Sequence, residues 1–176
     1  MKLDWPLVVG IIAMVLLVAG TVSEGGSVIQ KVLFVIGAPA LGVTAYANKQ
    51  KMFTALQSVA TVGAVLAFFP VVPGVLRYVT LVGAGLLGVA YLFKTGYYKE
   101  DKFGWIGTIG LLCIAAGFAT NATLHLLWFS LFLGVGGLVV AAYSALNFFH
   151  YKIKIALIWV VLNVLFSVGP ILNLVK

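Results

Sequence analysis

Residues 124–149 read LHLLWFSLFLGVGGLVVAAYSALNFF and contain no lysine, arginine, aspartate or glutamate. A helix over this stretch is about 39 Å long at 1.5 Å per residue, more than the roughly 30 Å hydrocarbon core of a bilayer. Lipid offers no partner to a backbone amide or carbonyl, so a chain that crosses it stays helical. The stretch is therefore typical of a membrane-spanning helix.

The rest of the chain has the same character. Hydrophobic residues make up 63% of the 176 residues and charged residues only 9%, and the mean hydropathy is +1.18. A water-soluble domain of this size cannot hide so much apolar surface. We therefore expect an all-α, polytopic membrane bundle that forms a single transmembrane domain over residues 1–176.

Turn residues divide this domain into about seven transmembrane helices. The predicted spans cover residues 5–21, 29–47, 52–69, 76–93, 104–120, 124–149 and 154–172. Pro70 and Pro73 end the third span because proline has no backbone N–H to donate, and residues 94–102 form a strongly polar loop. Lys2 and the apolar run after it could mark a signal peptide, but the run is long and no polar domain follows. We expect the first helix to be retained.

The basic residues predict the orientation. Alternate turns place eight lysines on one side of the membrane and only Lys31, Arg77 and Lys176 on the other. Short loops rich in lysine and arginine stay in the cytoplasm, so we expect a cytoplasmic N-terminus and an external C-terminus in the cell (inner) membrane. The basic residues that give the net charge of +7 lie singly at helix ends. This distribution favours attraction to lipid headgroups rather than binding of nucleic acid.

Small residues and a long period suggest internal organisation. The second, fourth and sixth spans carry small residues about four apart, which favours close helix contacts in the bundle interior. Trp5 and Trp105, and Pro70 and Pro170, pair at a period of 100 residues. Two parallel repeats, 5–70 and 105–170, joined by a linker helix at 76–93, would give a 3+1+3 arrangement. Chance matching of apolar sequence, or a hairpin period near 50 residues, would produce the same pairs.

Two stretches carry a resemblance to a transporter family. Residues 107–114 (GTIGLLCI) and 156–164 (ALIWVVLNV), together with the 3+1+3 order, resemble the SWEET and nicotinamide riboside transporter superfamily. This resemblance implies facilitative passage of a small solute. The chain lacks the Pro-Gln pair of the wider PQ-loop group and the Trp-rich motif of nicotinamide riboside carriers, so it does not indicate a substrate.

A second resemblance competes with the first. The hairpin over residues 53–93, with its Phe68-Phe69-Pro70 break and the pair Gly83 and Gly88, is similar to a unit of HdeD-type acid-resistance membrane proteins. That resemblance implies a structural or stress-response protein that transports nothing. The seventh, unpaired helix is where the chain departs from it.

Charged groups are absent from the middle of every predicted span, which argues against proton coupling and against acid–base catalysis. His125 and His150 begin and end one span, about 37 Å apart, so they cannot share a metal ion. Cys113 has no ligand partner at a suitable spacing and is expected to be a packing residue. We therefore expect no enzyme activity, no cofactor and no metal.

Uncharged polar residues remain as candidates for a solute site. They lie on the third and seventh spans, where they would face each other near mid-membrane if the repeat is real. The candidate substrate-binding residues are Gln57, Ser58, Thr61, Trp159, Asn163 and Ser167. The alternative is hydrogen bonding between helices, worth under about 1 kcal/mol each. Pro39, which weakens the second span, is a candidate hinge.

These patterns favour a facilitative transporter or pore for a small neutral or polar solute. An HdeD-like structural protein and an accessory subunit of a membrane complex are the alternatives. The expected partners are the lipid bilayer and a small-molecule solute, with a homo-oligomer or a membrane partner protein allowed by the sequence and no nucleic acid.

Overall fold

The computed structural model describes residues 5–23, 27–120, 125–153 and 155–175. Within these ranges the chain consists of helices and turns and contains no β-strand. The helices are α1 (Trp5–Val22), α2 (Val28–Ala47), α3 (Lys51–Leu66), α4 (Gly74–Lys94), α5 (Tyr97–Glu100), α6 (Gly104–Ala119), α7 (Leu126–Tyr151) and α8 (Ala156–Leu174).

Each predicted span corresponds to one long helix, with ends that differ by a few residues. The third predicted span is the most different, because α3 ends at Leu66 and the chain turns before Pro70. Ser27 caps α2, where its hydroxyl accepts a hydrogen bond of 3.2 Å from the Gln30 amide. Short helix α5 lies inside the segment that the sequence predicts as a polar loop.

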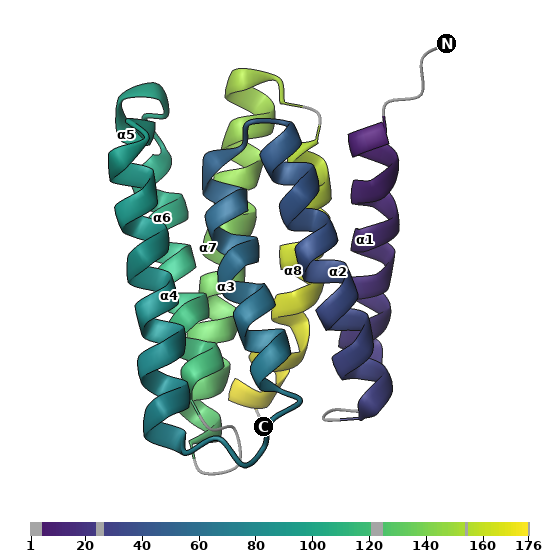
Figure 1. The fold of residues 1–176 in the computed structure, drawn as a ribbon. Coiled ribbons are helices and arrows are strands. Elements are labelled where there is room, and N and C mark those ends of the chain that lie inside the picture. Colours follow the sequence, from purple (N-terminus) through teal and green to yellow (C-terminus); the bar gives the residue numbers. More distant parts are fainter. Residues whose placement is uncertain (1–4, 24–26, 121–124, 154, 176) are drawn as a thin grey trace.

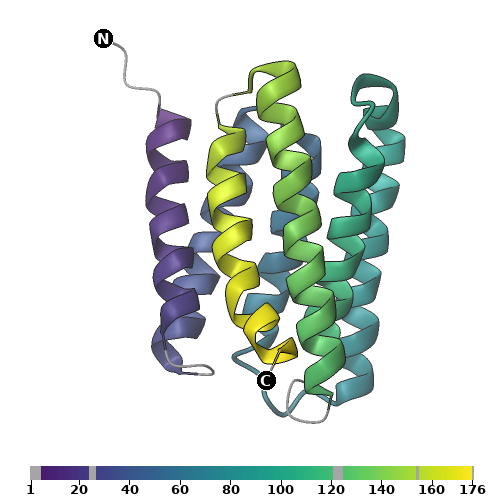
Figure 2. The same ribbon diagram turned by 180° about the vertical axis from the view of Figure 1, so that it is seen from behind.

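The long helices form a closed ring in chain order. Each packs on the next, α4 continues directly to α6, and α8 returns to α1 (Figures 1 and 2). Contacts inside the ring include one between α3 and α6, which leaves α4 on the outside, and side-chain contacts of Phe53 on α3 with Trp159 on α8. A chain that winds sequentially gives these neighbours with or without an internal duplication, so the proposed 3+1+3 repeat stays a prediction.

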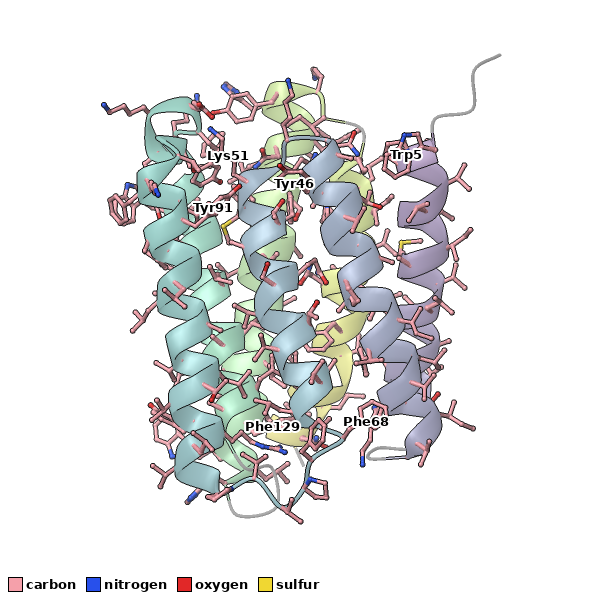
Figure 3. All side chains as sticks on the ribbon, in the orientation of Figure 1. Trp5, Tyr46, Lys51, Phe68, Tyr91 and Phe129 are labelled. Atoms are coloured by element: carbon pink, nitrogen blue, oxygen red, sulfur yellow. The ribbon has the colours of Figure 1, made fainter. Side chains whose placement is uncertain are left out.

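Five helices of the described chain, α1, α2, α4, α7 and α8, are long and apolar enough to cross a membrane. Helices α3 and α6 are also apolar but shorter, with 16 residues each. Carbon covers the flanks of the bundle, nitrogen atoms gather mainly at its two ends, and Trp5, Tyr46 and Tyr91 lie near one end (Figure 3). This distribution is compatible with an integral membrane protein.

Helix α7 lies deeper in the interior of the bundle than α4. Gly110, Gly117 and Gly136 bring α6 and α7 into such close contact that an added Cβ would lie less than 3.0 Å from an atom of the neighbouring helix. On α4, an added Cβ at Gly85 would lie 2.9 Å from Ala115 of α6 and one at Gly88 would lie 3.3 Å from Leu111 of α6, whereas Gly83 has nothing within 4 Å of that position. Only Leu81, Gly85 and Leu92 of α4 are buried, so the small residues of α4 make close contacts with α6, but this helix lies less deeply in the bundle than α7. Small residues permit close packing but do not select a partner.

The turns that carry most of the lysines lie at one end of the bundle, called here the lysine-rich end. They connect α2 to α3, α4 to α6 and α7 to α8 (Figure 1). Helix α1 begins at this end and α8 finishes at the other. At the opposite end, Arg77 donates a hydrogen bond of 2.9 Å to the Leu66 carbonyl, which satisfies a backbone acceptor that the end of α3 leaves free.

Candidate functional site

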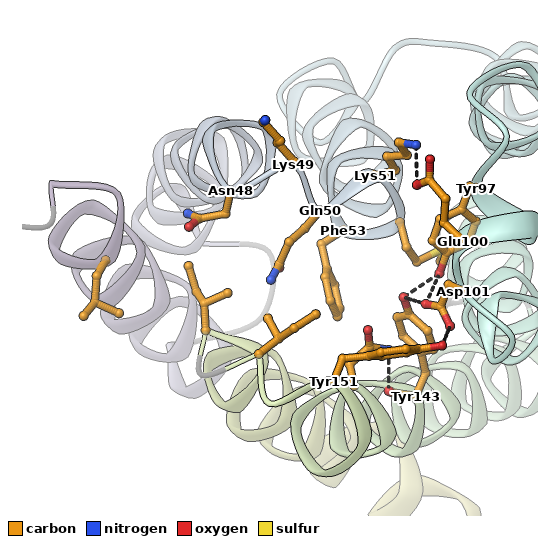
Figure 4. A pocket seen from close by; sticks show the side chains of 15 residues that line it. Asn48, Lys49, Gln50, Lys51, Phe53, Tyr97, Glu100, Asp101, Tyr143 and Tyr151 are labelled. Atoms are coloured by element: carbon orange, nitrogen blue, oxygen red, sulfur yellow. Dashed lines mark hydrogen bonds and ion pairs between the residues drawn. The ribbon is translucent and has the colours of Figure 1, made fainter.

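A pocket of about 530 Å³ opens at the lysine-rich end. Its walls come from the turn between α2 and α3, the short helix α5, the last turns of α7 and the residues before α8 (Figure 4). Uncharged polar and aromatic side chains dominate this lining, alongside two lysines and two carboxylates. The polar and aromatic lining residues are Asn48, Lys49, Gln50, Lys51, Phe53, Tyr97, Glu100, Asp101, Tyr143, Asn147 and Tyr151.

Asp101 is the buried charged group of this pocket. Its Oδ2 accepts hydrogen bonds from the hydroxyls of Tyr97 at 2.9 Å and Tyr143 at 2.8 Å. Its Oδ1 accepts from the Phe103 backbone amide at 2.8 Å and, at a longer 3.4 Å, from the Tyr151 hydroxyl. Among the described residues no basic side chain forms an ion pair with Asp101. Hydroxyl and amide donors therefore replace a cationic partner.

The two hydroxyl oxygens of Tyr97 and Tyr143 also lie within hydrogen-bond distance of each other. Burial raises the pKa of the Tyr97 phenol far above its ordinary value, and the neighbouring oxygens of Tyr143 and Asp101 raise it further. Tyr97 therefore keeps its proton at any physiological pH. The cluster joins α5 to α7 across 46 residues of sequence.

Local sequence explains how these groups meet. Gly96 has φ +68, a left-handed conformation that glycine adopts at little cost, and it turns the chain from α4 into α5. On α7, Tyr143, Asn147 and Tyr151 are spaced four apart and so share one helix face. Asn147 is buried and donates to the Tyr143 carbonyl at 3.0 Å.

Lys51 holds the opposite side of the α5 segment. Its Nζ donates to the Glu100 carboxylate and, at 3.0 Å, to the Thr95 carbonyl at the end of α4. Glu100 is largely exposed, so this ion pair contributes under about 1 kcal/mol. The ion pair between Lys51 and Glu100 positions α5 against α3, and it neutralises the charge of Lys51 at the pocket mouth.

An aromatic pair lies at the pocket wall between α3 and α8. Phe53 stacks on the fully buried Trp159, with ring centroids 4.4 Å apart and planes 5° from parallel. The Trp159 indole N–H donates to Gln50 Oε1 at 3.0 Å. Phe53 lines the pocket, whereas Trp159 lies behind it.

The structure separates the three polar candidates of α3. Gln57 is buried one turn beyond Phe53 on the same helix face, and its Oε1 is buried without a hydrogen-bond partner. Ser58 is exposed and donates to the Thr54 carbonyl of its own helix at 2.9 Å. Thr61 is half-buried and donates to the Gln57 carbonyl at 2.7 Å. Of the three, only Gln57 combines burial with an unsatisfied polar atom.

The candidates of α8 lie together along one buried face. Asn163 donates to the Trp159 carbonyl at 2.8 Å, and Ser167 donates to the Asn163 carbonyl at 2.7 Å. Ser167 also sits against α7, where a Cβ on Gly137 would meet its hydroxyl. Half-buried Pro39 lies within an unbroken α2, and its role as a hinge stays a prediction.

The Asp101 cluster was not foreseen from the sequence. Residues 94–102 are predicted as a strongly polar loop, and a polar loop does not indicate a buried carboxyl group. The structure buries Asp101 at the lysine-rich end, outside the predicted spans, so the expectation that the middle of each span holds no charged group is not contradicted by it. The available signal was the four-residue spacing of Tyr143, Asn147 and Tyr151, combined with an aspartate in the longest polar segment.

The fold and the pocket together define an all-α helical bundle with a polar, aromatic-lined pocket at one end. In comparisons of sequence and of fold, no protein-family model, curated protein or solved structure matches this chain. The function is therefore inferred from the site itself.

Proposed function

We propose that this chain is an integral protein of the cell (inner) membrane with seven spans, and that it is a facilitative carrier for a small neutral or weakly polar solute. The solute would bind first in the pocket at the lysine-rich end. The observation that carries this proposal is the pocket of about 530 Å³, lined by the amides of Asn48, Gln50 and Asn147 and by aromatic rings. Amide groups and ring faces are suited to a polar solute without charge.

Buried polar groups beyond the pocket support a path into the bundle. Gln57, Asn163 and Ser167 follow the Phe53–Trp159 pair along α3 and α8. The hydrogen bonds of Asn163 and Ser167 run to carbonyls of their own helix rather than to a neighbouring helix. A buried amide oxygen without a partner, as in Gln57, is costly unless a solute or water binds it.

The Phe53–Trp159 stack would separate the pocket from these deeper groups. In a carrier, the two rings would part as the solute passes from the pocket towards Gln57 and Asn163. The Gln50–Trp159 hydrogen bond connects this movement to the turn between α2 and α3. The stack is thus the proposed barrier of the closed state.

The seven spans and their orientation belong to the same proposal. Helices α3 and α6 have 16 residues each, about 24 Å at 1.5 Å per residue, which is a little short of the hydrocarbon core. They contact each other inside the ring and so depend less on lipid than the outer helices. Lysine-rich turns favour the cytoplasmic side.

Uptake into proteoliposomes tests the carrier. A panel of radiolabelled neutral solutes, including sugars, polyols and nucleosides, should contain at least one that enters faster than into empty liposomes and with saturation. Asn147→Leu and Asn163→Leu should each reduce that uptake by tenfold or more, because a buried amide that binds the solute is lost. Asn173→Leu, the same change at an exposed position of α8, is the matched control and should leave uptake unchanged.

Two outcomes would contradict the proposal. Uptake that never exceeds empty liposomes for any solute would favour a structural membrane protein of the HdeD type. If the protein also purifies only with a second membrane protein, an accessory subunit would be the better description. Equal loss in Asn147→Leu and Asn173→Leu would remove the pocket from the mechanism.

A further inference from the structure

Three aromatic rings form a cluster on the outer corner of the bundle where α4, α5 and α6 meet (Figure 1). The Tyr98 ring stacks on Trp105, with centroids 4.3 Å apart and planes 20° from parallel. The Phe93 ring packs against both, with its centroid 4.6 Å from Tyr98 and 5.7 Å from Trp105. We call Phe93, Tyr98 and Trp105 the corner cluster. None of its rings lines the pocket.

The corner cluster is fixed in place but still accessible. The Tyr98 hydroxyl lies 2.8 Å from Thr108 Oγ1 of α6, so a hydrogen bond holds the middle ring against the bundle. Phe93 and Trp105, on either side of it, are each more than half exposed. Aromatic rings at the end of a spanning helix lie at the level of the lipid headgroups. The cluster therefore offers lipid an apolar surface at this level.

Three lysines adjoin the corner cluster. Lys94 follows Phe93 at the end of α4. Lys99 follows Tyr98 in α5, and Lys102 lies just before α6. All three lysines are exposed. Lysine just beyond interfacial aromatic residues is suited to the phosphate of a lipid headgroup.

The two carboxylates of the same segment do not neutralise these lysines. Glu100 pairs with Lys51 of α3, and Asp101 accepts hydrogen bonds from tyrosine hydroxyls and from the Phe103 amide at the pocket wall. Lys102 lies over the Phe103 ring, with its Nζ 5.0 Å from the centroid, and this contact leaves its charge in place. Within the described part of the chain, none of the three lysines forms an ion pair. The corner therefore carries three uncompensated positive charges.

We propose that the corner cluster, together with Lys94, Lys99 and Lys102, is a binding site for an anionic phospholipid. The lysines attract the phosphate, and the exposed faces of Phe93 and Trp105 contact the first carbons of the acyl chains. A zwitterionic lipid brings a cationic group of its own, which the lysines repel, so the site favours a lipid with a net negative charge.

The occupant is a lipid of the bilayer and not free phosphate, because the exposed rings have no part in binding an ion from water. This inference rests on the membrane location given in the proposed function, but it requires neither transport nor a particular orientation. A bound lipid would contact α5 from outside the bundle, on a helix whose Tyr97 and Glu100 line the pocket.

Quenching of tryptophan fluorescence by brominated lipids tests the site, because bromine on an acyl chain quenches a ring that it contacts. Trp105 becomes the reporter in a Trp5→Phe, Trp128→Phe variant, since the remaining Trp159 is fully buried. The protein is reconstituted in mixed bilayers of phosphatidylcholine and phosphatidylglycerol, with bromine on either the zwitterionic or the anionic lipid. The two quenching curves give the relative affinity of the two lipids for the surface around Trp105.

Phosphatidylglycerol should be preferred at Trp105 by about threefold or more, since one lysine near an anionic headgroup contributes up to about fivefold in affinity. Lys94→Gln combined with Lys99→Gln should reduce the preference to less than about twofold. Lys49→Gln combined with Lys152→Gln is the matched control. It removes the same charge from exposed positions in two other turns at the lysine-rich end and should leave the preference unchanged.

A second reporter measures the bilayer away from the corner. Trp5 begins α1 at the same end of the bundle and is also exposed. In a Trp105→Phe, Trp128→Phe variant, Trp5 should be quenched by both lipids with a weaker preference than Trp105 shows.

Three results would overturn the lipid site. The preference at Trp105 could be no greater than at Trp5, it could survive the loss of Lys94 and Lys99, or the matched control could reduce it equally. An acidic cytoplasmic protein would then be the better partner for these lysines. If neither reporter is quenched, the membrane location fails and the lipid site fails with it. A clear preference at Trp105 without solute uptake would establish the lipid site and count against the carrier alone.

Discussion

Gly110 lies in the close contact between α6 and α7, so adding a single methyl group there should clearly lower the stability of the bundle. An alanine Cβ there would lie 2.5 Å from Val140 Cγ2 and 3.1 Å from both the Gly136 carbonyl oxygen and the Val140 amide nitrogen. Val140 is fully buried, and two of the three contacts are backbone atoms that no rotamer change can move. The two helices must therefore separate.

The magnitude follows from two opposing terms. Glycine to alanine in a helix favours folding by about 1 kcal/mol, whereas overpacking a tight contact costs about 1–3 kcal/mol. Gly83→Ala isolates the first term, because nothing lies within 4 Å of the added Cβ on α4. We expect Gly83→Ala to be neutral or up to about 1 kcal/mol more stable than the wild type. Gly110→Ala should be about 1–3 kcal/mol less stable than Gly83→Ala.

Equilibrium unfolding in mixed detergent micelles measures the difference, with the four tryptophans as fluorescent probes. Adding Val140→Ala to Gly110→Ala removes the closest contact but keeps both backbone contacts, so the double-mutant cycle should show favourable coupling and incomplete recovery. If Gly110→Ala is as stable as Gly83→Ala, the close approach of α6 and α7 described here is refuted.

Two further predictions concern the aromatic pair and the orientation. Trp159→Ala should lower the free energy of unfolding by about 3–5 kcal/mol because it empties a fully buried site. Trp159→Phe should lower it by less, because an aromatic ring remains against Phe53. Equal losses for the two variants, measured in the same micelles, would show that the stack with Phe53 contributes nothing. In a Cys113→Ser background, an impermeant maleimide applied to intact cells should label Val71→Cys, because Val71 is 88% exposed at the end opposite the lysine-rich end. The same reagent should label Lys99→Cys only after the cells are opened. The reverse pattern would place the lysine-rich end outside.

The elements of the fold could be predicted because each depends on residues close together in sequence. The charge-free run at residues 124–149 predicts a helix, and α7 extends over Leu126–Tyr151. A helix satisfies its own backbone hydrogen bonds and Pro70 ends one locally, so neither conclusion needs knowledge of distant residues. The same is true of the lysine-bearing turns, which lie at one end because consecutive helices are antiparallel and these turns alternate along the chain with turns that carry few lysines.

The partners of each helix could not be predicted in this way. The glycines of α4 and α7 look alike in sequence, but Gly134, Gly136 and Gly137 of α7 all contact a neighbouring helix, whereas on α4 Gly85 and Gly88 do so and Gly83 has open space beside it. An apolar face is satisfied by lipid as well as by another helix. The pattern of small residues alone therefore does not distinguish an interior helix from an outer one.

The candidate site shows more clearly which properties depend on local sequence and which depend on packing. The sequence by itself determined an apolar helical chain with polar groups on α3 and α8, because hydropathy and spacing are local properties. Only the tertiary structure brought Asp101 to Tyr143 and Tyr151, 42 and 50 residues further along the chain. That meeting depends on α4 and α6 holding α5 against the end of α7. A carboxylate that appears solvated in its own segment is thereby buried among hydroxyl groups, since burial is a property of the packed bundle and not of the segment.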